Sequence, residues 1–276
     1  MTTLTPSRCC EDGRATQIAA LRSGEIGAVH AWLRSTDTDG PGTRLVLRMS
    51  GCPLRCQYCH GPDSWRLRDG TLHTVDAVVA RIVRDAPLLR AGGGGVTLSG
   101  GEPLLQSSFV AEVLRRCHEE GVHTVLDTSG YLGRRADDAL LDNVDLVLLD
   151  VKSGLPDVYR AVTGRDLAPT LEFARRLSER GTAMWVRFVV VPGLTDSWDN
   201  VAAVAEHLSA LRTLDRVEVI PFEQSGRETW RTLGKAYRLE MTEPPDEELM
   251  ERVRAQFRAS GLPVREGRAV PAPAGS

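Results

Sequence analysis

The chain has 276 residues, of which 42% are hydrophobic and 26% charged, with a formal net charge of -3. This length suits one large domain, and the composition is that of an ordinary globular protein. The small net charge gives no reason to expect a nucleic acid or an anionic membrane as a partner. No apolar run reaches the roughly 18 residues of a membrane span, and the polar N-terminus MTTLTPSRCCEDGR lacks the apolar stretch of a secretory signal. We therefore expect a cytoplasmic protein.

The chain divides into one domain, residues 25–265, between two tails. Residues 1–24 and 266–276 are expected to be flexible, and the second tail ends in the Pro- and Ala-rich GRAVPAPAGS. Apolar strand candidates lie at 44–49, 95–99, 122–127, 144–150, 184–191 and 216–221. Helix candidates lie at 74–89, 106–120, 135–142, 169–180, 199–211 and 245–260.

The alternation of strands and helices predicts the class of fold. Short apolar strands separated by helices indicate a parallel sheet covered by helices. Six such units fit an open doubly wound sheet or a partial barrel, and periodicity does not choose between them. Asp127, Asp150 and the stretch 99–102 lie at the C-terminal ends of three expected strands. Because active-site residues of βα barrels collect at that rim, we expect an α/β fold, a partial (β/α)6 TIM-type barrel with parallel strands.

The cysteines point to a metal or cluster site. Three of the six lie within GCPLRCQYCH (51–60), as Cys52, Cys56 and Cys59. Thiolates are soft ligands that suit iron–sulfur clusters and zinc. Three ligands on a four-iron cube leave one iron open to bind a substrate, as an open position does on catalytic zinc. The alternative is a structural zinc with His60 as the fourth ligand.

The other cysteines carry no comparable pattern. Cys9 and Cys10 lie in the N-terminal tail, where their adjacency is read as chance. Cys117 falls on the apolar face of the helix expected at 106–120 and is expected to be buried as a small hydrophobe.

Several polar residues at strand ends are candidates for a ligand site. Gly100 and Gly101 would let a ligand approach the backbone, and Glu102 would accept hydrogen bonds from an ammonium group. By itself this GGE is also compatible with a plain βα turn. Lys152, two residues after Asp150, would form either a salt bridge at the rim or part of a site. Arg187 interrupts an apolar strand and requires a partner, which is either a structural carboxylate or a ligand.

These features occur together in a known family. With Tyr58 before the last cysteine, the cysteine spacing matches the signature of the radical S-adenosylmethionine superfamily. The chain resembles, over roughly residues 25–265, the glycyl-radical enzyme activases of the pyruvate formate-lyase activating type. The resemblance is carried, in order, by DGPGTR (39–44), GCPLRCQYCH (51–60), GGGVTLSGGEPLLQ (93–106), HTVLDTSG (123–130), DLVLLDVK (145–152), TLEFARRL (170–177), WVRFVVVPG (185–193) and ERV (251–253).

The resemblance implies two cofactors, and a third is considered with them. One 4Fe-4S cluster per chain would be held by Cys52, Cys56 and Cys59. S-adenosylmethionine would be bound by Tyr58, Gly100, Gly101, Glu102, Asp127, Lys152 and Arg187. A monovalent cation is a further candidate, with Asp127, Thr128 and Asp150 as ligands. Asp39 resembles a family residue close to the incoming glycine loop. Its DGPG stretch is also a sequence typical of a β-turn.

The resemblance also implies a reaction and partners. The reduced cluster would break a carbon–sulfur bond of S-adenosylmethionine, and the 5′-deoxyadenosyl radical would take a hydrogen atom from a glycine of pyruvate formate-lyase. A flavodoxin or ferredoxin would supply the electron, and the chain is expected to act as a monomer. The chemistry belongs to the cofactors, so no side-chain nucleophile or general base is required.

Two alternatives stay open. One is an activase of another glycyl radical enzyme, of the dehydratase or anaerobic ribonucleotide reductase type. Residues 60–98 contain no cysteine, which favours the short pyruvate formate-lyase type. The other is a zinc-stabilised binding protein without catalysis. The chain departs from the family at Gly61, Ser129 and Glu223, where the family commonly has Asn, Asn and His.

Overall fold

The computed structural model describes residues 16–266, and within them nine strands form one sheet. The sheet order is β3-β1-β2-β4-β5-β6-β7-β8-β9. From β2 to β9 all neighbours are parallel, whereas β1 pairs antiparallel with both β2 and β3. The strands are β1 (Ile26–Thr36), β2 (Thr43–Met49), β3 (Thr71–Thr74), β4 (Gly95–Gly100), β5 (His123–Thr128), β6 (Leu146–Asp150), β7 (Met184–Val190), β8 (Leu214–Pro221) and β9 (Val264–Glu266).

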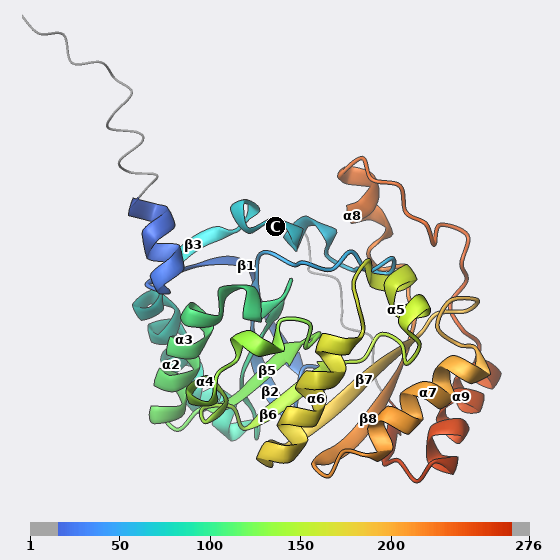
Figure 1. Cartoon of the computed structure of the whole chain (residues 1–276). Coiled ribbons are helices and arrows are strands. Elements are labelled where there is room, and N and C mark those ends of the chain that lie inside the picture. The colour runs from blue at the N-terminus through green and yellow to red at the C-terminus, as the bar shows by residue number, and fades with distance from the viewer. Residues whose placement is uncertain (1–15, 267–276) are drawn as a thin grey trace, which may run out of the picture.

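Helices connect the parallel strands and pack on one side of the sheet (Figure 1). The α-helices are α2 (Val75–Ala91), α3 (Ser107–Glu119), α4 (Asp138–Leu141), α5 (Pro156–Thr163), α6 (Ala168–Arg180), α7 (Trp198–Ser209), α8 (Arg227–Thr232) and α9 (Glu247–Ala259). Short 3-10 turns are η1 (Pro62–Trp65), η2 (Leu67–Asp69), η3 (Pro103–Gln106) and η4 (Gly133–Arg135). In the described residues, no helix is long and apolar enough to cross a membrane.

The strand order decides between the two architectures that the sequence left open. A doubly wound sheet reverses its strand order at a switch point and carries helices on both faces. Here β2, β4, β5, β6, β7 and β8 follow one another in chain order without reversal. The edge strands β3 and β9 pair with β1 and β8 rather than with each other. The prediction of a partial (β/α)6 barrel is therefore confirmed.

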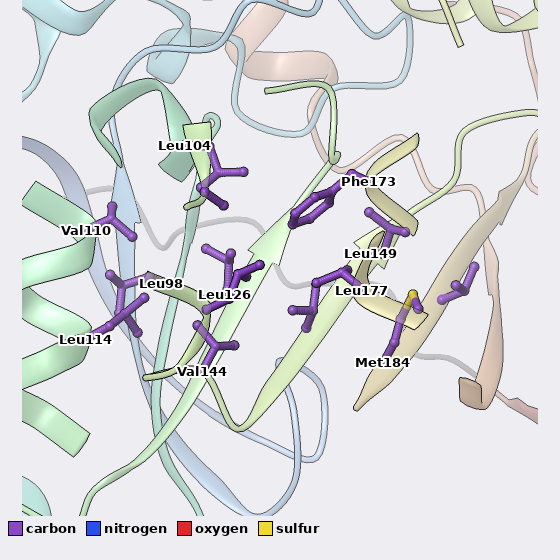
Figure 2. Packing of buried hydrophobic residues seen from close by; sticks show 14 of the residues in the cluster. Leu98, Leu104, Val110, Leu114, Leu126, Val144, Leu149, Phe173, Leu177 and Met184 are labelled. Atoms are coloured by element: carbon purple, nitrogen blue, oxygen red, sulfur yellow. The ribbon is translucent and has the colours of Figure 1, made fainter. Parts of the chain in front are cut away.

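The two faces of the sheet have different chemistry because side chains alternate along each strand. Leu98, Leu126 and Leu149 point toward the helices and join the main core with Phe173 of α6 (Figure 2). Their neighbours point into the barrel instead. There a small apolar cluster of Val125, Leu146, Leu148 and Trp185 fills the end of the barrel where the parallel strands begin. Polar residues follow it toward the C-terminal ends of the strands.

Some elements were not expected from the sequence. The six predicted strands and six helices are present with shifts of a few residues, although α4 is only one turn after the 3-10 turn η4. Strands β1, β3 and β9 and helices α5 and α8 are additional. Residues 16–23, which the sequence placed in the N-terminal tail, are helical. Residues 1–15 and 267–276, with Cys9 and Cys10, lie outside the described part of the chain.

Candidate active site

One cavity opens at the C-terminal ends of the barrel strands, and most of the sequence-predicted site residues line it. The predicted residues in its wall are Asp39, Cys52, Cys56, Tyr58, Cys59, Gly100, Gly101, Asp127, Thr128, Asp150, Lys152 and Arg187. They come from six separate segments of the chain, which the parallel sheet brings to one rim. Among the predicted site residues, Glu102 does not line the cavity.

The cysteine loop follows β2 and has little regular structure, so contacts from elsewhere hold it. The backbone N–H of Cys52 donates to Trp65 O at 3.1 Å. The N–H of Arg55 donates to Thr163 O at 2.8 Å, at the end of α5. The indole N–H of Trp230 in α8 donates to Cys59 O at 2.9 Å. Both α5 and α8 were missed from the sequence, yet they position the predicted ligands.

The two glycines of the GGE stretch let β4 end directly against the cysteine loop. Gly100 has φ +114, and a Cβ there would lie 2.2 Å from Met49 N. A Cβ on Gly101 would lie 2.4 Å from Gly51 O and 3.3 Å from Cys52 Cβ. Gly100 has a positive φ that favours glycine. At both positions a side chain would collide with the neighbouring part of the chain. The close approach seen here is between parts of the chain itself, and the approach of a ligand to these glycines stays a prediction.

The three thiols fit a cluster better than a single ion. All three are free and half-buried in the same cavity wall. Burial raises the pKa of each, to about 12 for Cys56, where the Lys152 ammonium opposes the rise. Among residues 16–266, no group of three His, Cys, Asp or Glu side chains is arranged to hold one metal ion. A zinc site needs four ligands about 2 Å from one centre, whereas a four-iron cube spreads three thiolates over separate corners.

Arg187 lies between two carboxylates. It donates through Nε to Asp150 at 2.9 Å and through Nη2 to Asp127. Lys152 Nζ donates to the other oxygen of Asp150 at 2.7 Å. Burial alone would raise the pKa of Asp150, but Arg187 and Lys152 outweigh it and bring the pKa down to about 2. The structural ion pair that the sequence allowed for Arg187 is therefore present.

These pairs occupy the oxygens that were predicted to bind a monovalent cation. Asp127 accepts from Arg187 and also from Ser99 Oγ at 2.6 Å. Thr128 Oγ1 donates to Glu102 at 2.7 Å. The cation site stays a prediction, and a cation would have to compete with the guanidinium of Arg187 for both carboxylates.

Two buried polar atoms in the cavity wall have no partner in the described structure. They are Nη1 of Arg187 and the hydroxyl of Tyr58. A buried donor without an acceptor costs about 1–3 kcal/mol, and such atoms usually mark a ligand or water. Both residues line the cavity with the cysteines. They therefore fit a polar cofactor such as S-adenosylmethionine beside the cluster.

Glu102 is a structural clamp in this conformation. Its side chain is 1% exposed, and its oxygens accept from Leu104 N, Thr128 Oγ1, Ser129 N and Ser129 Oγ. These bonds tie the end of β4 to the end of β5. Its predicted contact with an ammonium group stays a prediction, and the oxygens are already satisfied within the chain.

Asp39 and Gly61 lie at the cavity, whereas Glu223 lies outside it. Asp39 is buried in the cavity wall, and its carbonyl accepts from Thr97 Oγ1 at 2.7 Å. Gly61 lines the cavity, whereas Glu223 is exposed outside it. Cys117 is buried in the main core, as expected.

The cavity also contains a residue that sequence reasoning missed, Arg48 of β2. His60, which the sequence offered only as a fourth zinc ligand, lines the cavity too, and burial lowers its pKa to about 4. Arg48 interrupts the apolar strand RLVLRM. That is the same signal that singled out Arg187, so the residue was detectable from the pattern.

The comparisons with known proteins agree with this geometry. The family model described as "Radical SAM superfamily" matches residues 46–205, which include the cysteine loop and the strand ends through Arg187. A radical SAM methyltransferase from Sphaerobacter thermophilus shares the fold, with a TM-score of 0.62 at 19% identity over 96% of this chain and 82% of that one. The fold and site thus define a radical S-adenosylmethionine protein.

More similar relatives narrow the class. The pyruvate formate-lyase 1-activating enzyme of Escherichia coli K12 is 38% identical over 87% of this chain and 98% of its own length. That of Staphylococcus aureus USA300 is 40% identical over 84% and 94%. A domain of the Bacteroides vulgatus enzyme has a TM-score of 0.54 at 26% identity, covering 63% of this chain and 99% of that one. The chain belongs to the pyruvate formate-lyase activating enzymes of the radical S-adenosylmethionine superfamily.

Proposed function

We propose that this chain activates pyruvate formate-lyase by forming a glycyl radical on it, with a 4Fe-4S cluster and S-adenosylmethionine as cofactors. The observation that carries the proposal is the single cavity that brings three free thiols together with the strand-end charges and two unpaired donors. The substrate is inferred from the names of relatives that span almost the whole domain.

Each part of the cavity has a role in this proposal. Cys52, Cys56 and Cys59 would hold the cluster, leaving one iron open for S-adenosylmethionine. When bound, these cofactors supply the electron and the carbon-centred radical that removes a hydrogen atom from glycine. The unpaired Arg187 Nη1 and Tyr58 hydroxyl would orient the bound S-adenosylmethionine. The apolar floor at Leu148 and its neighbours excludes water from below.

The setting of the reaction belongs to the same proposal. A flavodoxin or ferredoxin would donate the electron, and the chain would work as a cytoplasmic monomer with residues 25–265 as its catalytic domain. Asp39, buried at the cavity wall, would lie beside the incoming glycine loop.

Anaerobic reconstitution with iron and sulfide tests the proposal. We expect about four iron atoms per chain and a reduced-state electron paramagnetic resonance signal that changes shape when S-adenosylmethionine is added. With pyruvate formate-lyase, an organic radical should then appear on that protein. The Cys56→Ala variant should give neither signal. A reconstituted protein without iron, or one that leaves pyruvate formate-lyase free of radical, would overturn the proposal.

A further inference from the structure

Arg48 is a buried cation without a partner at the cluster end of the cavity. Its side chain points into the barrel from β2, is 8% exposed, and lines the cavity beside Cys59 and His60. Across residues 16–266 it makes no hydrogen bond and no ion pair. Arg44, four residues earlier on the same face, donates instead to Thr97 Oγ1 and to backbone carbonyls. A buried cation normally has a counter-charge, so Arg48 is placed for one that arrives later.

Gly61 makes room for this guanidinium. A Cβ at Gly61 would lie 2.8 Å from Arg48 Nη2 and 3.4 Å from Asp63 Oδ1. Any side chain at position 61 would therefore push Arg48 away from its place. The φ of Gly61 is -126, so its backbone does not itself demand glycine. The departure from the family at position 61 and the arginine at position 48 thus form one structural unit.

The charges around Arg48 show which anion remains for it. Asp63 is the neighbouring carboxylate. Its Oδ2 pairs with His30 at 3.3 Å, whereas its Oδ1 has no hydrogen-bond partner and forms no ion pair with Arg48. Lys152 and Asp150, further along the cavity wall, pair with each other. The three cysteine thiolates, when they hold a cluster, would add further negative charge to the cavity wall that Arg48 lines.

We propose that Arg48, with Gly61 as its matching space, raises the electron affinity of the cluster. This inference rests on the proposed function, because it requires the cluster. One electron from a low-potential donor enters the cluster, and no bond forms or breaks and no proton moves. A cluster with three thiolate ligands is already anionic, and reduction adds a further negative charge. A cation held in the same cavity wall stabilises the reduced form more than the oxidised one.

The expected size follows from Coulomb's law. Two unit charges roughly 10 Å apart, at an effective dielectric constant of about 20, shift an equilibrium by about tenfold. Arg48→Met should therefore lower the ratio of reduced to oxidised cluster about tenfold at a fixed solution potential. Arg48→Lys keeps the charge and should retain most of the ratio. Arg66→Met is the matched control, because Arg66 is an exposed arginine near the same loop whose charge water screens.

The measurement is an anaerobic redox titration followed by electron paramagnetic resonance, with iron content determined for each variant and without pyruvate formate-lyase. Gly61→Asn is the second test, since it displaces Arg48 without removing it, and it should shift the ratio in the same direction. An unchanged midpoint potential in fully loaded Arg48→Met or Gly61→Asn protein overturns the inference and leaves the proposed function intact. A wild-type chain that binds no iron overturns both.

Discussion

Asp150 is an acid held between two cations, and that arrangement has a consequence for stability. Its pKa in the folded chain is about 2, below the 3.8 of a free carboxyl, because Arg187 and Lys152 outweigh the effect of burial. A lowered folded pKa stabilises the fold fully above about pH 4, and this contribution is lost as the pH falls toward 2. The shift corresponds to about 2 kcal/mol.

Asp150→Asn should remove this part of the acid sensitivity. The free energy of unfolding of the wild type should fall between pH 4 and 2 by about 2 kcal/mol more than that of the variant. Urea unfolding of the metal-free proteins, followed by circular dichroism at several pH values, measures the difference. Parallel pH profiles for the two proteins would show that Asp150 is not held in this ion pair.

Glu102 gives a prediction that separates a clamp from a ligand. Glu102→Gln replaces one accepting oxygen with a donor that faces the N–H and hydroxyl of Ser129. We expect a loss of about 2–3 kcal/mol of stability in the absence of any cofactor. Glu112→Gln, which alters only an exposed ion pair with Arg115, is the control and should cost less than about 1 kcal/mol. Equal stability of the wild type and Glu102→Gln would contradict the structural role of Glu102.

At the residue scale, the sequence predicted membership of the site better than contacts within it. Cysteine spacing identifies soft ligands locally, because all three lie within eight residues. Two of the residues that bind Glu102, Thr128 and Ser129, lie 26 and 27 positions away, and no local pattern records such a distance. Similarly, the sequence offered Arg187 either a carboxylate of the chain or a ligand as its partner. The register of β6 and β7 sets Asp150 opposite Arg187 and so identifies a carboxylate partner.

At the scale of elements, the turn after β4 depends on a glycine that no other residue replaces. Gly100→Ala would bring a Cβ to 2.2 Å from Met49 N with φ +114, so it should cost more than about 3 kcal/mol and reduce iron loading. Gly121→Ala is the control, because Gly121 has φ +64 and nothing lies within 4 Å of a Cβ there. It should cost about 1 kcal/mol. Chemical unfolding and iron analysis of both variants test this, and equal losses would contradict it.

The elements that were predicted from the sequence are those whose apolar residues follow one regular pattern, either that of a helix or that of a buried strand. Strands buried on both faces are continuous apolar runs, and the six of them were found. Strand β1 was missed because its residues have mixed burial and its pairing with β2 is irregular between Val29 and Ala31. Helix α5 is short, but Pro156 at its start and left-handed Gly164 after its end are the usual boundary signals. These signals stand in the sequence, although α5 was missed.

At the scale of the whole molecule, one alternation of side chains organises both stability and function. Odd and even positions of each parallel strand separate into an apolar outer face under the helices and an inner face that ends in charges. The cysteine loop closes over that inner face and is held by the end of α5, by α8 and by the 3-10 turn η1. The main core under the helices therefore lies apart from the loop expected to hold the cluster, whereas strand-end residues such as Gly100 contribute to both stability and cofactor binding.

Cluster loading should reveal this separation in amide hydrogen exchange. The loop at 51–61 is held by backbone bonds to Val162 and Thr163 at the end of α5 and by the Trp230 indole in α8. Bonds from three cysteines to one cluster would restrict the loop, so its exchange and that of α5 and α8 should slow by about tenfold or more. Helices α2 and α3 pack on the outer face away from the cavity and should exchange unchanged. Equal slowing of amide exchange in α2 and α3, or no slowing at 51–61, would contradict this division. The Cys56→Ala protein treated with iron and sulfide is the control.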